Sequence, residues 1–324
     1  MWRRLTLAAG VAIAASCAAM SVRAADYPTR PISLILGFAP GGPSDVVARV
    51  VSRKMEQILG QPVVIENRPG AGGNAAAEAV ARSTPDGYTL AFATNGMMAT
   101  NVSLYKKIGY DPVKDFAPIT IIGTQANILY VHPSVPAQSL AELVALAKAN
   151  PGKLNFASGG HGTAGHLAGE LFKTEAKIDI VHVAYKGTGP ALQDVLAGHV
   201  QMAFSAAAPL IAHIQSGAVR PLAVTSLKRT AALPDIPAFT ELGYPGFEAV
   251  TWHSIVAPAG TPKEVIDTLH RAAIMALQDG DVKNQLATLG VDIVGNTPDE
   301  FATYVKAEIP KWAAIIKASG ATVE

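Results

Sequence analysis

The segment Phe38-Ala39-Pro40-Gly41-Gly42-Pro43-Ser44-Asp45 joins an apolar run at 32–38 to a run of helical periodicity at 46–59. In the second run the apolar residues recur at helical spacing, with Ser44 placed as the N-cap and Gly60 just past the end. The pattern predicts a strand, a glycine turn and a helix. Glycines let the backbone come close to a ligand, and the first amides of a helix have no partner inside it. Such a turn attracts anions, unless it is an ordinary tight connection that binds nothing.

Related loops recur along the first third of the chain. A short strand at 63–65 is followed by the glycine loop 69–74 and an alanine-rich helix at 75–82. A third strand at 88–93 ends at Thr94-Asn95-Gly96. Three such units in succession are typical of a mostly parallel sheet with helices on its faces.

A second series of units begins after an extended apolar run at 117–122. The patterns predict strands at 128–131, 154–157, 180–184, 200–204 and 219–225. They predict helices at 140–149 with Ser139 as N-cap, after the loop 158–166 through 172, at 190–197 with proline in first position, and at 209–215. The glycine-rich loop 185–189 precedes the third of these helices.

The remaining chain is mostly helical. An extended run at 254–257 precedes helices at 262–277, 282–289 and 298–316. Because this tail has too few strands for a third domain, we expect it to pack on the first. The predicted organisation is α/β with two lobes: a discontinuous domain 1 at 25–122 and 252–324, domain 2 at 123–251, and two crossover strands near 120 and 250.

Residues 1–24 have the features of a secretory signal peptide. Arg3 and Arg4 form its basic region, 5–15 its apolar core, and 22–24 a small-residue site, so we expect cleavage after Ala24 and a periplasmic location. The apolar run is far shorter than the roughly 20 residues of a membrane span. General secretion is favoured over twin-arginine export, since the rest of the twin-arginine motif is missing.

The composition excludes several classes of protein. In a 324-residue chain, 49% hydrophobic and 16% charged residues favour large buried cores over disorder. The only cysteine, Cys17, lies in the leader, so the mature chain has no disulfide, thiol nucleophile or zinc-thiolate site. Loss of the leader leaves 23 basic and 25 acidic residues, a net charge of −2. A weakly acidic chain without basic clusters is not expected to bind nucleic acid.

The glycine loops are the candidate binding elements. Parallel α/β sheets bind ligands at the carboxyl ends of their strands, and the loops 40–45, 70–74, 158–166 and 187–189 all fall at such ends. Two loops on each side of a cleft would form a clamp of backbone amides suited to a carboxylate. Hydroxyl groups for the same ligand are offered by Ser44, Ser158, Thr163 and Ser205.

Other chemistries have weaker signals. Ser158 with His161 or His166 suggests a hydrolase, but the G-x-S-x-G elbow and a placed acid are missing. His161 and His166 are five residues apart, so on a helix they would not share a face for a metal. A Walker phosphate loop is also missing, and no cofactor is expected. Lys186 is a ligand cation or a solvated loop lysine, and Asp45 complements the helix dipole or contacts the ligand. Trp252 and Tyr185 form a cleft wall or ordinary packing.

Several ordered motifs, taken together, resemble one family over nearly the whole mature chain. They are 27–32 (YPTRPI), 40–49 (PGGPSDVVAR), 66–73 (ENRPGAGG), 84–90 (TPDGYTL), 157–163 (ASGGHGT), 185–187 (YKG) and 256–262 (VAPAGTP). At these residues the sequence resembles the Bug family, the extracytoplasmic substrate-binding receptors of tripartite tricarboxylate transporters.

The resemblance implies a type II periplasmic binding protein that closes on a small carboxylate by a hinge. In the family, the loops matching 40–45 and 158–166 hold a carboxylate, largely through backbone amides and ordered water. Relatives often carry an acidic residue after the position of Phe204, where this chain has Ser205. A group for a ligand ammonium is then missing, which favours a plain or aromatic carboxylate over an amino acid.

The expected protein is a monomeric receptor without catalytic activity, metal or cofactor. Its expected partners are a small organic acid, with one, two or three carboxylates, and the membrane subunits of a transporter. A sensor of ligand for a signalling partner and a secreted hydrolase using Ser158 and His161 are the alternatives. The predicted ligand-binding residues are Pro40, Gly41, Gly42, Pro43, Ser44, Asp45, Asn74, Thr94, Asn95, Ser158, Gly160, His161, Gly162, Thr163, Ala164, His166, Tyr185, Lys186, Gly187, Ser205 and Ala206.

Overall fold

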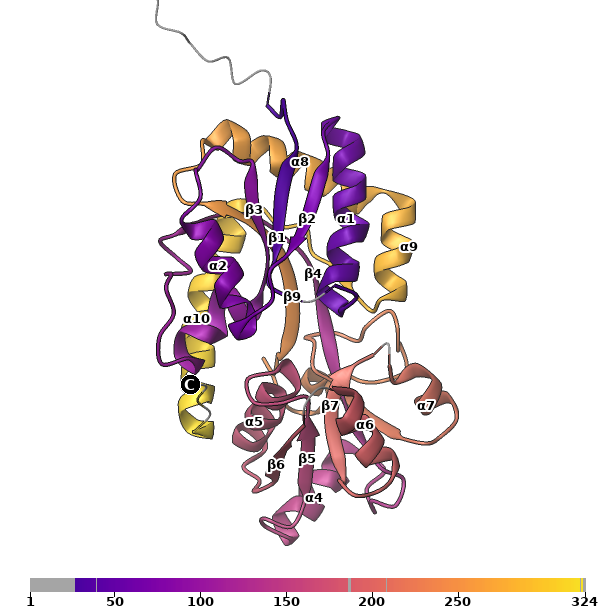
Figure 1. The fold of residues 1–324 in the computed structure, drawn as a ribbon. Coiled ribbons are helices and arrows are strands. Elements are labelled where there is room, and N and C mark those ends of the chain that lie inside the picture. Colours follow the sequence, from indigo (N-terminus) through magenta and orange to yellow (C-terminus); the bar gives the residue numbers. More distant parts are fainter. Residues whose placement is uncertain (1–26, 39, 186–187, 208, 321, 323–324) are drawn as a thin grey trace, which may run out of the picture.

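The computed structural model describes residues 27–38, 40–185, 188–207, 209–320 and 322. The predicted signal peptide and the candidate site residues Lys186 and Gly187 lie outside this part of the chain. Within it, no helix combines the length and the apolar character that a membrane span needs. Helices and strands alternate as the sequence predicts, and they form two groups that are joined by two long strands (Figure 1).

The first group is built on three parallel strands in the order β2-β1-β3. These are β1 (Ile32–Leu36), β2 (Val63–Asn67) and β3 (Thr89–Thr94). One face is covered by α1 (Pro43–Leu59) and α8 (Lys263–Gln278), whose apolar residues share a core with the strands. The other face carries α2 (Asn74–Ala81), which follows the short turn η2 (Ala71–Gly73). After β3 come η3 (Gly96–Thr100) and α3 (Asn101–Leu104).

The second group has its own parallel strands in the order β7-β5-β6. These are β5 (Asn155–Ser158), β6 (Val181–Ala184) and β7 (Met202–Ala206). Its helices are α4 (Leu140–Ala149), α5 (Ala164–Ala176), α6 (Thr188–Leu196) and α7 (Ile211–Gln215). The strand β8 (Arg220–Val224) pairs with β4, and the turn η4 (Phe239–Leu242) follows it.

Two antiparallel strands connect the groups. Both β4 (Phe116–Val131) and β9 (Val250–Pro258) run from one group to the other (Figure 1). The sequence predicts two separate strands at 117–122 and 128–131, whereas the structure forms one strand of 16 residues. Polar residues such as Gln125 and Asn127 interrupt the apolar pattern, but the strand continues across them, because pairing with β9 extends to Ala126 and pairing with β7 begins at Asn127.

The C-terminal helices return to the first group. Helix α9 (Gly280–Thr288) and the short strand β10 (Asp292–Ile293) follow α8, and β10 pairs with β4. Helix α10 (Pro298–Ser319) contacts α3 of the first group and also α5 of the second. The domain boundaries drawn from the sequence remain a prediction.

Two helices differ at their N-terminal ends from the prediction. Gly42, rather than Ser44, is the N-cap of α1, and Pro43 is its first residue. Proline is well placed there because its missing N–H would have no partner in the helix. Within the described residues, α6 is already helical at Thr188, two residues before the predicted Pro190. The predicted cap of α4 is confirmed, since Ser139 accepts a hydrogen bond from the Glu142 N–H.

Candidate functional site

A cavity of about 400 Å³ is lined by residues of both groups and of the crossover strands. The β1–α1 loop and α1 contribute to one wall, the loop before α5 contributes to the opposite wall, and β4 and β9 contribute between them. The lining residues are Phe38, Pro43, Ser44, Gly72, Thr94, Asn95, Gly96, Thr100, Asn101, Leu104, Tyr105, Gln125, Asn127, His161, Gly162, Thr163, Ala164, Gly165, Thr188, Phe204, Ala206, Thr251 and His253.

The predicted site residues divide into those that line this cavity and those that do not. Lining it are Pro43, Ser44, Thr94, Asn95, His161, Gly162, Thr163, Ala164 and Ala206. Away from its lining are Pro40, Gly41, Gly42, Asp45, Asn74, Ser158, Gly160, His166, Tyr185 and Ser205. The two loops that the sequence predicts to oppose each other therefore do meet at one cavity, through only some of their residues.

Three glycine amides that the sequence offers as ligand donors are already bonded within their own loops. The Gly41 N–H donates to Asp45 Oδ2 at 2.9 Å, and the Gly162 N–H donates to His166 Nδ1 at 3.0 Å. The Gly160 N–H donates to Ser158 Oγ at 3.2 Å. In the structure, side chains of the same loops satisfy these three donors, and the clamp of loop amides around a carboxylate stays a prediction.

Further backbone donors among the described cavity residues belong to the first turns of two helices. Ser44 lies in the first turn of α1, and Ala164 and Gly165 begin α5; all three line the cavity. N–H groups in a first turn have no acceptor inside the helix. A Cβ on Gly165 would lie 2.5 Å from the Phe204 carbonyl oxygen, so α5 approaches β7 closely here. Helices of 17 and 13 residues thus direct the positive ends of their dipoles at one cavity.

The side chain of Asp45 stabilises the β1–α1 loop. Its side chain is buried and accepts hydrogen bonds from Gly41, from the Arg49 guanidinium at 2.8 and 3.0 Å, and from Asn67 Nδ2 at 2.9 Å. The Arg49 hydrogen bond is the main cause that lowers the pKa of Asp45 to about 2. The carboxylate is therefore ionised and fully bonded.

Two more predicted ligand residues are also held in hydrogen bonds away from the cavity. Asn74 is buried and accepts hydrogen bonds from Asn101 Nδ2 at 2.7 Å and from the Tyr110 hydroxyl at 2.9 Å. The Tyr185 hydroxyl donates to Asp194 at 2.6 Å, and burial is the first cause that raises its pKa to about 12. Both side chains stabilise loops next to the cavity.

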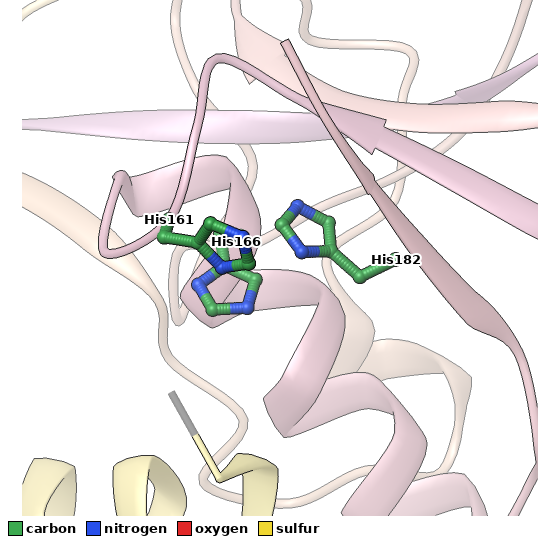
Figure 2. Close-up of side chains that lie close together, drawn as sticks. All are labelled: His161, His166 and His182. Atoms are coloured by element: carbon green, nitrogen blue, oxygen red, sulfur yellow. The ribbon is translucent and has the colours of Figure 1, made fainter. Parts of the chain in front are cut away.

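His161, His166 and His182 form a cluster beside the cavity (Figure 2), with one nitrogen of each within 4.8 Å of the others. His161 precedes α5, so His161 and His166 are not on one helix, and the sequence spacing that argued against a shared metal site does not separate them. The sequence carries no signal for His182, which lies on β6. The rings of His166 and His182 are stacked with centroids 4.0 Å apart, and His161 lies edge-on to both.

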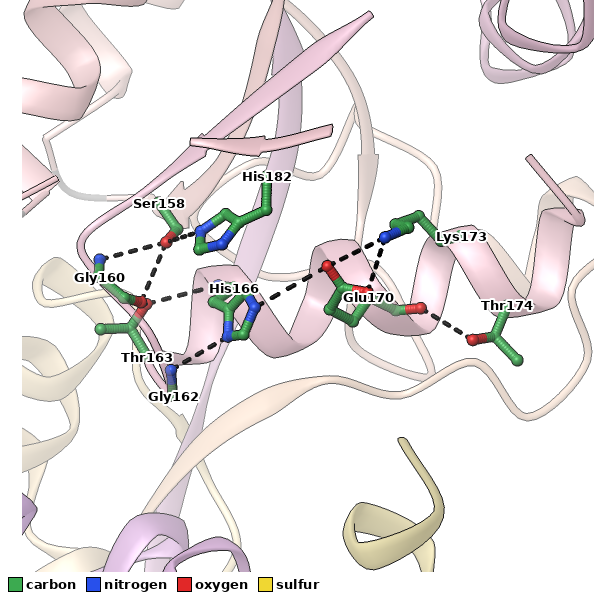
Figure 3. Close-up of polar contacts among 9 residues, drawn as sticks. All are labelled: Ser158, Gly160, Gly162, Thr163, His166, Glu170, Lys173, Thr174 and His182. Carbon is green, nitrogen blue, oxygen red and sulfur yellow. Dashed lines mark hydrogen bonds and ion pairs between the residues drawn. The ribbon is translucent and has the colours of Figure 1, made fainter. Parts of the chain in front are cut away.

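The stacking does not suit a metal ion. Zinc needs nitrogen lone pairs that converge at about 2.0–2.1 Å, whereas stacked rings direct their lone pairs side by side. One nitrogen of His166 accepts from Gly162, and His182 Nε2 lies 2.7 Å from Ser158 Oγ (Figure 3). Burial is the main cause that lowers the pKa of His166 to about 3 and that of His182 to about 4. In this arrangement the neutral rings stabilise the loop at 159–163.

The structure does not support a Ser158–His161 hydrolase. Ser158 Oγ contacts His182 rather than His161, and only 1% of the Ser158 residue surface is exposed. A nucleophile in that position could not reach a substrate in the cavity.

Other cavity residues were not identified from the sequence. On the crossover strands, Gln125 and Asn127 alternate on β4, and Thr251 and His253 alternate on β9. Polar residues at every second position of an apolar strand were a signal that could have revealed this wall. Three further lining residues, Gly72, Gly165 and Thr188, lie in the predicted loops 70–74, 158–166 and 187–189 but were not among the predicted ligand residues. The other lining residues carry no such signal: Phe38, Gly96, Thr100, Asn101, Leu104, Tyr105 and Phe204.

His253 is an unusual member of this wall. Its ring is buried and stacked on Phe92, and neither ring nitrogen has a hydrogen-bond partner among the described residues. Burial lowers its pKa to about 4, so the ring is neutral.

Several known proteins are similar to this chain over most of its length. The sequence model of the family "Tripartite tricarboxylate transporter family receptor" matches residues 47–321. The chain is 38% identical to protein BugT of Bordetella pertussis, over 99% of both chains. Among solved structures, R. palustris Rpa4515 with adipate is 36% identical with a TM-score of 0.78, and covers 92% of this chain and 100% of its own. MatC from Rhodopseudomonas palustris with bound malate is 33% identical with a TM-score of 0.74, and covers 90% and 100%.

Proposed function

This chain belongs to the tripartite tricarboxylate transporter receptor family, whose members bind solutes and catalyse no reaction; we propose that it holds a small organic carboxylate between its two groups of strands. Relatives of the same fold were solved with adipate and with malate. We infer that the ligand of this chain is an acid of similar size.

One observation carries the proposal: the N-termini of α1 and α5, from opposite groups, open into the same cavity. A carboxylate oxygen accepts several N–H bonds, and each charge-assisted bond contributes about 1.5–3 kcal/mol. Neither helix end alone is specific. Two helix ends facing one space form a site that an anion would complete by bridging the groups.

Closure follows from the same arrangement. Since β4 and β9 connect the groups, a change of their curvature would open or close the cavity as a hinge. A ligand that contacts both groups binds the closed state better, so it shifts the equilibrium toward closure. We therefore propose that 25–122 with 252–324, and 123–251, are the two moving domains.

Titration calorimetry with acid and amide pairs tests the binding proposal. Adipate and malate are compared with adipamide and malamide, which keep the carbon skeleton and lose the charge. We expect one-to-one binding of at least one carboxylate, no detectable binding of its amide, and a higher melting temperature with the acid. If a broad panel of carboxylates gave neither heat nor a thermal shift, the proposal would be rejected.

Family membership supports a proposal for the location and the partners of this chain. We propose that the receptor is exported, cleaved after Ala24, and works as a monomer in the periplasm, where it delivers its ligand to the membrane subunits of a transporter. Mass spectrometry of the mature protein, purified from periplasm, tests the cleavage site and the monomeric state. A mature chain that retained the leader would contradict the first, and a stable dimer the second.

A further inference from the structure

Both cavity loops share one local device. In each, a glycine just before the helix donates its N–H to a side chain four residues further along: Gly41 to Asp45 at 2.9 Å and Gly162 to His166 at 3.0 Å. Both glycines adopt positive φ, +81° and +75°. Each acceptor residue is only 2% exposed and is absent from the cavity lining, although its neighbours in the loop line the cavity.

The β1–α1 loop is held from a second strand as well. Asp45 Oδ1 accepts from Asn67 Nδ2 at 2.9 Å, and the same amide donates to the Phe38 carbonyl oxygen at 2.9 Å. Asn67 ends β2, so the two ends of the loop are tied to a neighbouring strand. The Arg49 guanidinium neutralises the buried carboxylate, which lowers its repulsion of an anionic ligand.

The loop before α5 is held by a chain of contacts along that helix (Figure 3). His166 Nε2 lies 3.8 Å from Glu170 Oε1, and Lys173 Nζ lies 3.0 Å from Glu170 Oε2. The Thr163 hydroxyl donates to the Gly160 carbonyl oxygen at 2.8 Å and accepts the His166 N–H at 3.4 Å. Because the ring is neutral, its Nδ1 keeps the lone pair that the Gly162 N–H needs.

We propose that Asp45 and His166 are positioning residues for ligand binding, each fixing one cavity loop by accepting the N–H of its glycine. This inference rests on the proposed function. Neither side chain touches the ligand. Each removes a competing conformation of a glycine loop, so that the first-turn amides of α1 and α5 already face the cavity before ligand arrives. Binding then spends less free energy on ordering the loops.

Matched substitutions separate positioning from general stability. His166→Asn keeps an acceptor near the position of Nδ1, whereas His166→Leu keeps the approximate volume and removes the acceptor. His270→Leu is the control, because it makes the same change on α8, away from the cavity. There the His270 ring lies 3.1 Å from the carbonyl oxygen of Asn296. For the other loop, Asp45→Asn and Asp45→Leu form the corresponding pair.

Two measurements are made on the full mature protein, one of them without ligand. Amide hydrogen exchange at Gly162 is expected to be about tenfold faster in His166→Leu than in wild type, and unchanged in His166→Asn and His270→Leu. Calorimetry with adipate and malate is expected to give about tenfold weaker binding for His166→Leu, with recovery in His166→Asn. The Asp45 pair is expected to act in the same way on Gly41.

The outcomes separate the positioning role of His166 from the proposed binding of a carboxylate. Unchanged exchange at Gly162 in a folded His166→Leu protein overturns the positioning role, whatever the ligand. Equal affinities of wild type, His166→Leu and His166→Asn overturn it as well. A wild-type protein that binds no carboxylate of the panel counts against the proposed function instead, while the exchange result still tests the role of His166.

Discussion

At the scale of single residues, two positions at the cavity, Gly165 and His253, are unusual in their packing or hydrogen bonding. Gly165 allows α5 to lie against β7, and a Cβ there would meet the Phe204 carbonyl oxygen at 2.5 Å. His253 instead leaves two ring nitrogens without partners among the described residues. The close approach restricts position 165 to glycine, and the unpaired nitrogens of His253 lower stability. Both residues line the cavity.

Gly165→Ala is expected to displace the start of α5. We expect the free energy of unfolding to fall by about 1–3 kcal/mol, because the overlap is with backbone, and carboxylate affinity to fall too. Urea unfolding and calorimetry measure the two effects. Gly189→Ala on α6 is the control: among the described residues its Cβ would meet nothing within 4 Å, so helix propensity predicts a small gain in stability. Equal stabilities of Gly165→Ala and wild type would refute the close-approach argument.

His253→Phe is expected to raise stability. The change keeps a ring that can stack on Phe92 and removes two buried nitrogens without partners, whose desolvation is unfavourable by about 1–3 kcal/mol. We expect a gain of about 1 kcal/mol in urea unfolding, since the larger ring offsets part of the benefit. A loss of stability would mean that the nitrogens have partners in solution, such as water.

At the scale of elements, the first turns of α1 and α5 differ in one donor. Helix α1 begins with Pro43, which has no N–H, whereas α5 begins with Ala164, which has one. Proline fits the first position of a helix without strain. At α5, Thr163 precedes this position and is extended, with φ −67° and ψ 157°, which is the conformation that a residue before proline favours. One donor can therefore be deleted while the helix is kept.

Ala164→Pro is expected to weaken carboxylate binding by about tenfold or more, because one charge-assisted N–H bond is lost. The melting temperature without ligand should change little. Lys263→Pro makes the same change at the first position of α8, away from the cavity, and should leave affinity unaltered. Undiminished affinity in a folded Ala164→Pro protein would exclude the Ala164 N–H as a ligand donor.

At the scale of the whole molecule, the buried histidines His166 and His253 and the half-buried His182 couple stability to pH. Burial lowers the pKa values of His166, His182 and His253 to about 3, 4 and 4, below the ordinary value of 6.5. Two of them lie beside the loop before α5 and one lies on β9. In the unfolded chain these rings take up protons near pH 6.5, whereas in the folded protein they stay neutral to about pH 4.

The free energy of unfolding should therefore be nearly constant above pH 7 and fall as the pH is lowered from about 6.5 to 4. Urea unfolding at steps across this range measures the slope. His253→Phe removes one of the three groups and should give a shallower slope. A stability that rose toward pH 4 would contradict buried neutral rings.

The sequence by itself determined the α/β class, the glycine loops and most helices and strands, because apolar periodicity, caps and glycine positions are local properties. It also predicted that the loops at 40–45 and 158–166 meet at one cavity. Only the tertiary structure decided that Gly41 and Gly162 donate to Asp45 and His166, that His182 joins the cluster, and that β4 is continuous. Those outcomes depend on contacts between segments far apart in the chain, or on which acceptor is nearest in space, and neither is written in spacing along the sequence.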